Sequence, residues 1–583
     1  MANQLYETIK GYGNPFALST NEFVKIDDHS IFDDEVANNI RGLSKMAYEQ
    51  YAEYARSVLQ EGGTSIHETL KKNSLKLLSS RGRSITTKDK KIKLLTKNNA
   101  LFAQLAAALQ SREGDLEEFF KYELHPFPPS ISDFSELYLP GNKSQIIKVL
   151  APASTQCPPK EVDAKIFDGA FLVHLLPTTN TPTFNDFAET FIQYLTMRLE
   201  DTNWVDIVWD RYNSSSLKAA TRKKRGEGIR RHITGTTKIE KWADFLKNSQ
   251  NKADLFNFLT EKVKGHAFPS GKTVYISHGR ATLTNEGNSD NLVDQITMER
   301  TNHEEADTRI LLHVLHAALE GRKLIEVRTG DSDVVIILMA HFFHLKQRTG
   351  LQDVWVFFGV GKTSQSLSLA SMTEPLGKKK CESLLMFHAM TGADTVSGFK
   401  SCGKKKAWEA TKVVPEVVDI FQQCYSNPYE RVSMQSNEFN TIEKFIVAMY
   451  GKTIQASTVN LGRKMIFFQR SQNVEHIPPC QNSLYQHYLR ALYQAGVWAS
   501  SLEYVMNLPG PDGYGWKYQS DDSSEVKWSP VWMTQREAME ECRKLFLTCS
   551  CKGACTNCKC AKAALNCTAM CSCACPQKTP NDT

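Results

Sequence analysis

The sequence is short of the features that take proteins into membranes or out of the cell. No run of about 18 apolar residues is present, because the longest apolar stretch, Val334–Ala340, is far too short to cross a bilayer. The opening residues, MANQLYETIKGYGNPF, lack a basic segment followed by an apolar one, so we expect no secretory signal. A strong excess of one charge is missing as well, since 70 basic residues face 64 acidic ones and the net charge is +6. Such a balance permits a nucleic-acid partner without demanding one.

Two familiar enzyme motifs are present only in part. GVGKTS at residues 359–364 ends like a phosphate-binding P-loop, but Val356 stands where that loop needs its first glycine. The stretch that starts at His303 begins like the zinc-protease motif H-E-x-x-H, but Asp307 stands in place of the second histidine. Neither a P-loop NTPase nor a zinc protease of this kind is expected.

The chain of 583 residues is long enough for about three or four domains. Residues 1–150 are expected to be mainly helical, with no role assigned to them. Across residues 160–412, short apolar strands alternate with helical stretches, which predicts an α/β domain with a parallel sheet and helices on both faces. Residues 413–545 read as helical and tryptophan-rich. Their tryptophans Trp516, Trp528 and Trp532 fit a small packed core or a base-stacking platform, and the composition favours the core.

Carboxylates mark the ends of several predicted strands and the starts of two predicted helices. In an open parallel sheet, ligands bind beyond the carboxyl ends of the strands. Carboxylates brought together there would repel one another unless divalent cations neutralised them, and oxygen ligands suit Mg²⁺ or Mn²⁺. Two such ions about 4 Å apart are an established means of cleaving a phosphodiester. Any one of these acids could instead be a helix N-cap, but that interpretation is hard to extend to all of them. The acids are Asp168, Asp210, Glu305, Asp307, Asp331, Asp333 and Asp394.

At these residues the sequence resembles the flap-endonuclease branch of the PIN-like nucleases. VWDRYNSSSLKAATRKKRG, from Val208, is similar to that family's second acidic strand and the basic helix after it. EAD and DSD resemble its Glu-Ala-Glu and Asp-x-Asp pairs, and TGADTVSGFKSCGKKKAWE resembles its Gly-x-Asp followed by a helix–two-turn–helix. Asp168 matches the acid of the first strand. The resemblance covers roughly residues 160–412 and implies a PIN-like fold and a structure-specific, metal-dependent nuclease that acts on DNA, with RNA as a possible partner.

The resemblance also assigns roles to individual residues. The seven acids would hold two Mg²⁺ or Mn²⁺ ions. Lys218 and one of the basic residues after it, with Arg222 as first candidate, would contact the scissile phosphate. Residues 211–304, between two of the acids, could form an arch that threads a single strand or an ordinary insertion, which leaves flap specificity open. The residues expected to bind nucleic acid are Lys223, Lys224, Arg225, Ser397, Gly398, Gly403, Lys404, Lys405 and Lys406.

Nine of the 15 cysteines lie close together near the end of the sequence. In a reducing compartment, thiolates at this density predict zinc ligands rather than disulfides, and with bridging thiolates they could hold about three ions. The spacing resembles the CXC domain of the tesmin/TSO1 group, which binds DNA, and it implies phosphate contacts for Lys559 and Lys562. A purely structural zinc module at residues 546–577 is the alternative. The nine residues are Cys549, Cys551, Cys555, Cys558, Cys560, Cys567, Cys571, Cys573 and Cys575.

The combined hypothesis is a DNA nuclease with a two-metal mechanism and a zinc-cysteine tail that helps to hold DNA. Two alternatives stay open: an inactive nucleic-acid-binding protein that keeps the nuclease fold, and a zinc-stabilised scaffold that binds other proteins. A nuclear location is expected, and the architecture is similar to that of uncharacterised proteins associated with mobile elements.

Overall fold

The structure is a computed structural model of the chain. It describes residues 23, 34–61, 119–123, 127–133, 136–138, 142–151, 157–179, 181–212, 216–218, 228–285, 293–294, 298–361, 364–467, 474–519, 527–534, 547–551, 558–568 and 571–573.

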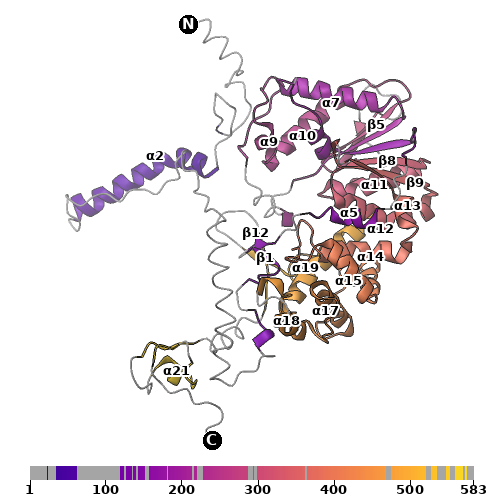
Figure 1. The fold of residues 1–583 in the computed structure, drawn as a ribbon. Helices are drawn as coiled ribbons and strands as arrows, with labels where there is room; N and C mark the ends of the chain where they lie inside the picture. Colours follow the sequence, from indigo (N-terminus) through magenta and orange to yellow (C-terminus); the bar gives the residue numbers. More distant parts are fainter. Residues whose placement is uncertain are drawn as a thin grey trace. The chain divides into compact units, whose positions relative to one another are not determined.

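An eight-stranded sheet organises the larger of the two compact units into which the chain divides (Figure 1). The strand order is β10-β9-β8-β3-β4-β5-β6-β7, and the five strands from β9 to β5 in that order run parallel. The predicted α/β class with a mostly parallel sheet is therefore confirmed. The strands are β3 (Ala164–Asp168), β4 (Trp204–Val208), β5 (Thr273–His278), β6 (Ala281–Thr284), β7 (Val293–Asp294), β8 (Leu324–Thr329), β9 (Asp353–Phe358) and β10 (Gln365–Ser368).

Burial explains why the central strands could be found in the sequence. Every residue of β3 and β4 is buried, as expected for central parallel strands covered on both faces. The outer strands β5, β6 and β7 come from residues 211–304, so part of that stretch extends the sheet by antiparallel pairing of β6 and β7. Gly169 follows β3 because any side chain there would collide with the ring of Trp209, which lies 2.2 Å from the position of a Cβ atom.

Two long helices carry the acids that do not end a strand. Helix α11 (Ala306–Leu319) is buried over almost its whole length and packs against β3, β4 and β8. Helix α12 (Ser332–Thr349) packs against α11 and ends at Gly350, whose positive φ of 68° suits a glycine C-cap. Both helices therefore belong to the core, and their first turns are fixed at the same edge of the sheet as the ends of β3 and β8.

Further helices pack around α12 and share its core (Figure 1). Phe119, Ile146 and Ile147, from the N-terminal region, lie in the same buried cluster as the sheet and as Leu484 of α19. The domain boundaries predicted near residues 150 and 412 therefore do not divide this part of the chain into regions with separate hydrophobic cores. These elements are α5 (Gln145–Leu150), α13 (Leu369–Thr373), α14 (Gly377–Met390), α15 (Lys404–Val413), α16 (Val417–Ser426), α17 (Asn437–Tyr450), α18 (Val459–Ile466), α19 (Gln481–Ala499) and the short turn η6 (Ser500–Leu502). Helix α6 (Gly169–Leu175) follows β3 and packs against it, and the short turn η5 (Val474–His476) comes before α19.

The second compact unit comprises residues 1–87, 176–193 and 225–262. Its described helices are α2 (Asp34–Tyr54) with the turn η2 (Ala55–Gln60), α9 (Trp242–Phe245), and most of α7 (Phe184–Arg198) and α10 (Ser249–Lys264). Phe184, Phe187, Trp242, Phe245 and Phe258 form an aromatic cluster within it. Residues 211–304 thus contribute to this unit as well as to the sheet.

Small elements complete the described chain. Two hairpins pair β1 (Ser132–Asp133) with β2 (Glu136–Leu137) and β11 (Trp516–Gln519) with β12 (Lys527–Pro530). The cysteine-rich segment contains one short helix, α21 (Lys559–Lys562). None of the helices in the described part of the chain has the length and apolarity that a membrane span requires.

Candidate metal centre

The sheet reverses its strand order at β3 and β8, and the candidate site lies at that point. From β3, the chain order continues through β4 and β5 on one side and through β8 and β9 on the other. Such a reversal opens a crevice beyond the carboxyl ends of the strands. Asp168 ends β3, Asp331 follows β8, and the Thr329 hydroxyl donates a 3.0 Å hydrogen bond to Asp168 Oδ2. The structure therefore brings these two acids to one edge of the sheet.

The N-termini of α11 and α12 supply four carboxylates, of which Asp331 is one and three are additional. Glu305 occupies the N-cap position of α11 and Asp307 lies in its first turn, while Asp331 and Asp333 hold the equivalent places in α12. The positive end of each helix dipole stabilises negative charge at these positions. Carboxylate oxygens of Asp307, Asp331 and Asp333 lie within 4.8 Å of one another. A metal ion could accept one oxygen from each of these three residues.

Asp210 joins the same group through the backbone of α11. Its Oδ1 accepts a 2.8 Å hydrogen bond from the amide of Ala306, and its Oδ2 accepts one from the Tyr212 hydroxyl at 3.3 Å. Asp331 caps α12 in a similar way, because its Oδ1 accepts a 2.9 Å hydrogen bond from the Asp333 amide. Both carboxylates thus accept hydrogen bonds at helix N-termini, as the alternative interpretation predicts. Capping and membership of the carboxylate group are therefore compatible.

Lys218 lies inside the carboxylate group. Its ammonium is 2.7 Å from Glu305, 3.7 Å from Asp307 and 3.5 Å from Asp394. Asp394, which follows α14, is brought into the group by this lysine and by a second one. The structure thus places Lys218 next to three of the acids, and its contact with a phosphate stays a prediction.

The second lysine, Lys143, was not foreseen from the sequence. Its ammonium lies 2.9 Å from Asp331, 3.1 Å from Asp333 and 3.3 Å from Asp394. It belongs to a turn just before α5, 188 residues upstream of Asp331, and nothing in its local sequence marks it. The two ammonium groups occupy two separate positions among the acids, where the carboxylates would otherwise repel one another.

Burial and mutual repulsion perturb the protonation of this cluster. Burial, followed by the charge of Asp210, raises the pKa of Asp168 to about 7. Burial also raises the pKa of Glu305 to about 7, although Lys218 opposes the shift, and it raises the pKa of Asp307 well above its usual range. For Asp333 the effect of burial is outweighed by Lys143 and His388, which hold its pKa well below the usual value. Without further cations the cluster retains protons, and a divalent ion would displace them.

His388, on α14, fixes the orientation of the Asp333 carboxylate. Its Nε2 lies 2.9 Å from Asp333 Oδ1, and burial lowers the pKa of the ring to about 4. A neutral ring can only donate to that carboxylate through a protonated Nε2, which fixes the tautomer. Histidines on apolar helices are usually core residues, so nothing around His388 in the sequence marks it as part of the site.

The loop after Asp394 differs from the prediction. Lys404 is buried, and its ammonium donates hydrogen bonds to the His388 carbonyl at 2.9 Å, the Thr391 hydroxyl at 3.0 Å and the Gly392 carbonyl at 2.9 Å. It therefore fixes the turn that leads to Asp394 and cannot reach a nucleic acid.

The other predicted nucleic-acid contacts have mixed outcomes. Ser397 is buried, and the Gly398 amide donates to the Tyr138 carbonyl at 2.8 Å. Lys405, Lys406 and Gly403 are exposed and stay as candidates. The candidates Arg222, Lys223, Lys224 and Arg225 lie outside the described residues.

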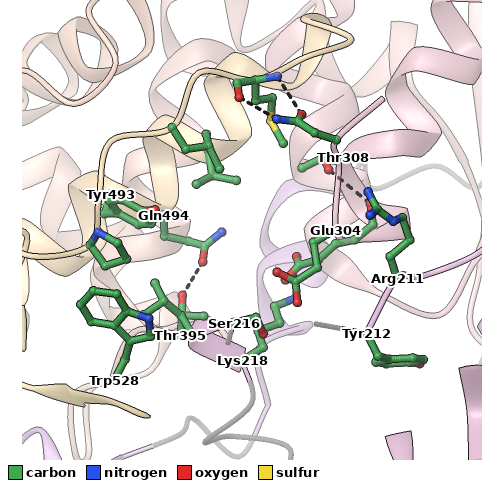
Figure 2. Close-up of a pocket in the computed structure, with 17 residues that line it drawn as sticks. Arg211, Tyr212, Ser216, Lys218, Glu304, Thr308, Thr395, Tyr493, Gln494 and Trp528 are labelled. Carbon is green, nitrogen blue, oxygen red and sulfur yellow. Dashed lines mark hydrogen bonds and ion pairs between the residues drawn. The ribbon is translucent and has the colours of Figure 1, made fainter. Parts of the chain in front are cut away.

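A cavity of about 830 Å³ opens beside the acids (Figure 2). One wall comes from the sheet edge and holds Glu304, Glu305 and Lys218. The opposite wall carries Tyr493 and Gln494 of α19 together with Trp528 of β12 and a loop with Met506, Leu508 and Pro511. Its size falls within the range of about 300–1,000 Å³ that is usual for small-molecule sites. No sequence signal points to it, because it is formed by segments that are distant in the chain.

The cysteine-rich segment gathers its thiols into two overlapping groups. One holds Cys549, Cys567, Cys571 and Cys573, and the other holds Cys549, Cys558, Cys560 and Cys567. Within each group the sulfur atoms lie within 4.8 Å of one another, as ligands of a shared ion would. Cys551 is also described and packs against this cluster, whereas Cys555 and Cys575 lie outside the described residues. Lys559 and Lys562 are exposed.

Comparisons with known proteins give matches among solved structures alone. No family model matches the chain, and no curated protein matches it. The catalytic core of Rad2 in complex with a DNA substrate aligns with 56% of this chain and 94% of its own, at 12% identity and a TM-score of 0.28. A complex of the D15 flap endonuclease of bacteriophage T5 with DNA and metal ions aligns with 58% and 97%, at 12% identity and a TM-score of 0.27. The T5 5'-exonuclease with bound zinc aligns with 52% and 98%, at 14% identity and a TM-score of 0.27.

Proposed function

We propose that the chain is a metal-dependent nuclease that hydrolyses phosphodiesters of structured DNA by a two-metal mechanism. One observation carries the proposal: five carboxylates from α11, α12 and the turn after α14 contact the ammonium groups of two lysines, and the carboxylates that follow β3 and β4 lie next to this group. Among the described residues, the acids of this group outnumber its lysines by up to five negative charges. Such an excess suits divalent cations better than it suits a purely structural ion-pair network.

The donor atoms fit Mg²⁺ or Mn²⁺. They are all carboxylate oxygens, and three of them lie close enough together to share an ion. Asp307, Asp331, Asp333 and Asp394 would hold one ion, and Asp168, Asp210 and Glu305 would complete the second position. When bound, these ions supply Lewis-acid stabilisation and an activated water for attack on phosphorus.

The chain's own residues would position the DNA around this centre. The Lys218 ammonium, at the rim of the cavity, would neutralise a phosphate oxygen, with Arg222 as a second candidate from the segment after it. Lys143 would approach the same phosphate from the opposite side of the acids. His388 would keep Asp333 ionised and correctly oriented through its 2.9 Å hydrogen bond.

The cysteine-rich segment would help to hold the DNA. Its two thiol groups fit zinc, because sulfur ligands at this spacing select a soft, tetrahedral ion. The exposed Lys559 and Lys562 would then meet backbone phosphates. A CXC-type module, a nuclear location and an association with mobile elements are parts of the same proposal.

The test is cleavage of flap, hairpin and single-stranded oligonucleotides, as DNA and as RNA, with Mg²⁺ or Mn²⁺. We expect Asp331→Asn/Asp333→Asn to lower the rate at least about a thousandfold, because several kcal/mol of charge stabilisation would be lost. Asp419→Asn is the matched control, since this aspartate is exposed and pairs with Lys379 on the surface. Binding of DNA with no cleavage by the wild type would replace the proposal with an inactive DNA-binding protein.

A further inference from the structure

The cavity beside the acids has a second wall that is not part of the sheet. Tyr493 and Gln494 lie on α19, and Trp528 lies on β12, all beyond the stretch 160–412 that resembles nucleases. Figure 2 shows this wall facing Glu304 and Lys218 across the cavity. Glu305 and Lys218 line the cavity and also belong to the carboxylate cluster, so the two sites are continuous.

The chemistry of this second wall suits a flat, partly polar ring. Trp528 is half-buried, and the Tyr493 hydroxyl is held by the Pro509 carbonyl at 3.1 Å. Gln494 is buried, and its Oε1 accepts a hydrogen bond from the Thr395 hydroxyl, which fixes the amide. Within the described residues its Nε2 has no hydrogen-bond partner, and Figure 2 shows this nitrogen directed toward the middle of the cavity. Aromatic faces with a fixed donor at the edge are the usual means of holding an unstacked nucleobase.

The charges of the lining argue for a base rather than a phosphate. Arg211 and Lys218 are balanced by Glu304 and Glu305, and Lys218 is already paired with Glu305 at 2.7 Å. Among the described lining residues, positive charge therefore does not exceed negative charge, and these residues do not draw a sugar-phosphate chain inward. Apolar side chains, among them Met506, Leu508 and Pro511, add surface that favours a neutral ring.

We propose that this pocket binds one unpaired nucleobase of the strand being cut, stacked on Trp528 and hydrogen-bonded to the Gln494 amide. The proposal rests on the nuclease function above and narrows its substrate. A base inside a duplex reaches such a pocket only after unpairing, so the nucleotide beside the scissile phosphate must be single-stranded or easily opened. A free nucleoside monophosphate would offer the same base chemistry, and the experiment separates these two sources.

The test places a single abasic residue at successive positions around the cut in flap and single-stranded oligonucleotides. Full-length wild type is compared with Trp528→Ala, Trp528→Phe and Gln494→Ala, and with Gln423→Ala, an exposed glutamine on α16, as the matched control. At one position, loss of the base should slow wild-type cleavage and weaken binding about tenfold or more, as loss of one stacked base does elsewhere. Trp528→Ala and Gln494→Ala should lose this discrimination, whereas Trp528→Phe and Gln423→Ala should keep it. Thermal melting of each variant checks that it is folded.

The outcomes separate this inference from the nuclease proposal. Cleavage that is equally fast at every abasic position would overturn the pocket assignment and leave the nuclease intact. No cleavage, together with position-dependent binding that Trp528→Ala abolishes, would keep the base pocket and reject the nuclease. Tight binding of deoxynucleoside monophosphates with no dependence on bases in the oligonucleotide would overturn the assignment to the strand.

Discussion

The carboxylate centre and the cysteine-rich segment are both candidate metal sites, but they are held together in opposite ways. The carboxylates come from residues 168–394 and are fixed by β3, β8, α11 and α12, which are packed in the main core. The cysteines lie within residues 549–575, and the buried hydrophobic members of their described cluster are themselves cysteines, Cys549, Cys558 and Cys560. The main core therefore positions the carboxylates whether or not a metal ion is bound. In the cysteine-rich segment the ligands make up almost the whole core, so we expect this segment to fold only when it binds its metal ion.

Removal of tightly bound metal is expected to have the largest effect. It should change the folding of the cysteine-rich segment and of the carboxylate region differently. Structural zinc sites contribute about 10–16 kcal/mol of apparent binding free energy, so a strong zinc chelator should unfold residues 547–573. The carboxylate region should stay folded, because its acids are positioned by buried strands and helices. Hydrogen exchange measured segment by segment would show both results. Protection of the cysteine segment that survives complete removal of zinc would contradict the comparison.

The carboxylate centre can also be disturbed indirectly, by changing a residue that holds one of the metal ligands in position. His388→Ala removes the donor that orients Asp333, and loss of such a contact usually lowers metal affinity or activity by about 10–100-fold. Raising the Mn²⁺ concentration should restore much of the cleavage rate. His341→Ala is the matched control, because His341 is an equally buried histidine that contacts the Trp498 carbonyl at 3.0 Å. Equal losses in the two variants, without rescue by Mn²⁺, would reduce the role of His388 to packing.

A smaller effect is expected on the pH dependence of stability. It comes from Asp206, a buried acid that the same core keeps neutral and that needs no metal ion to do so. Asp206 on β4 lies 2.6 Å from Nδ1 of His313 on α11, and both side chains are fully buried. Burial raises the pKa of Asp206 to about 8 and lowers that of His313 well below its usual range, so the folded pair holds one proton up to about pH 8. The unfolded pair also holds one proton below about pH 6.5, on the histidine, and holds none above it.

The sign of the pH effect follows from this proton count. The folded state binds the extra proton between about pH 6.5 and 8, so the stability from the pair is present at the lower pH and lost as the pH rises, by about 2 kcal/mol. Asp206→Asn keeps a hydrogen-bonding side chain and removes the titration, so its stability relative to wild type should increase over this window. Denaturant unfolding at pH 6.5 and 8 measures the difference. A wild type and variant with parallel pH profiles would show that the pair is not neutral in the fold.

The two regions also show what the sequence could and could not predict. Asp168 and Asp331 were recognisable because the first ends β3 and the second comes just after β8, two strands with buried apolar residues, and a parallel sheet brings such strand ends together. Lys143 was not recognisable, because its place among the acids depends on how the turn before α5 packs against residues far along the chain. Lys404 shows the opposite error, since a lysine in a basic loop turned out to be buried under three hydrogen bonds.

The tryptophans illustrate the limit of composition. The alternatives for residues 413–545 were a packed core and a base-stacking platform, and the structure shows a core position for two of the three tryptophans. Trp516 and Trp532 are buried, as a core requires, whereas Trp528 lines the cavity beside the acids. Composition placed the three residues together but could not separate them, because their exposure is decided by the pairing of β11 with β12 and by the position of α19.

The most direct test of the account is a count of Mn²⁺ ions bound to the full-length chain, by electron paramagnetic resonance or calorimetry. We predict that the wild type and Asp419→Asn bind two ions at the carboxylate centre. Asp331→Asn/Asp333→Asn should lose this binding while its sheet stays folded and its cysteine segment keeps its zinc. Unchanged Mn²⁺ binding in the double variant, or no Mn²⁺ binding by the wild type, would contradict the account.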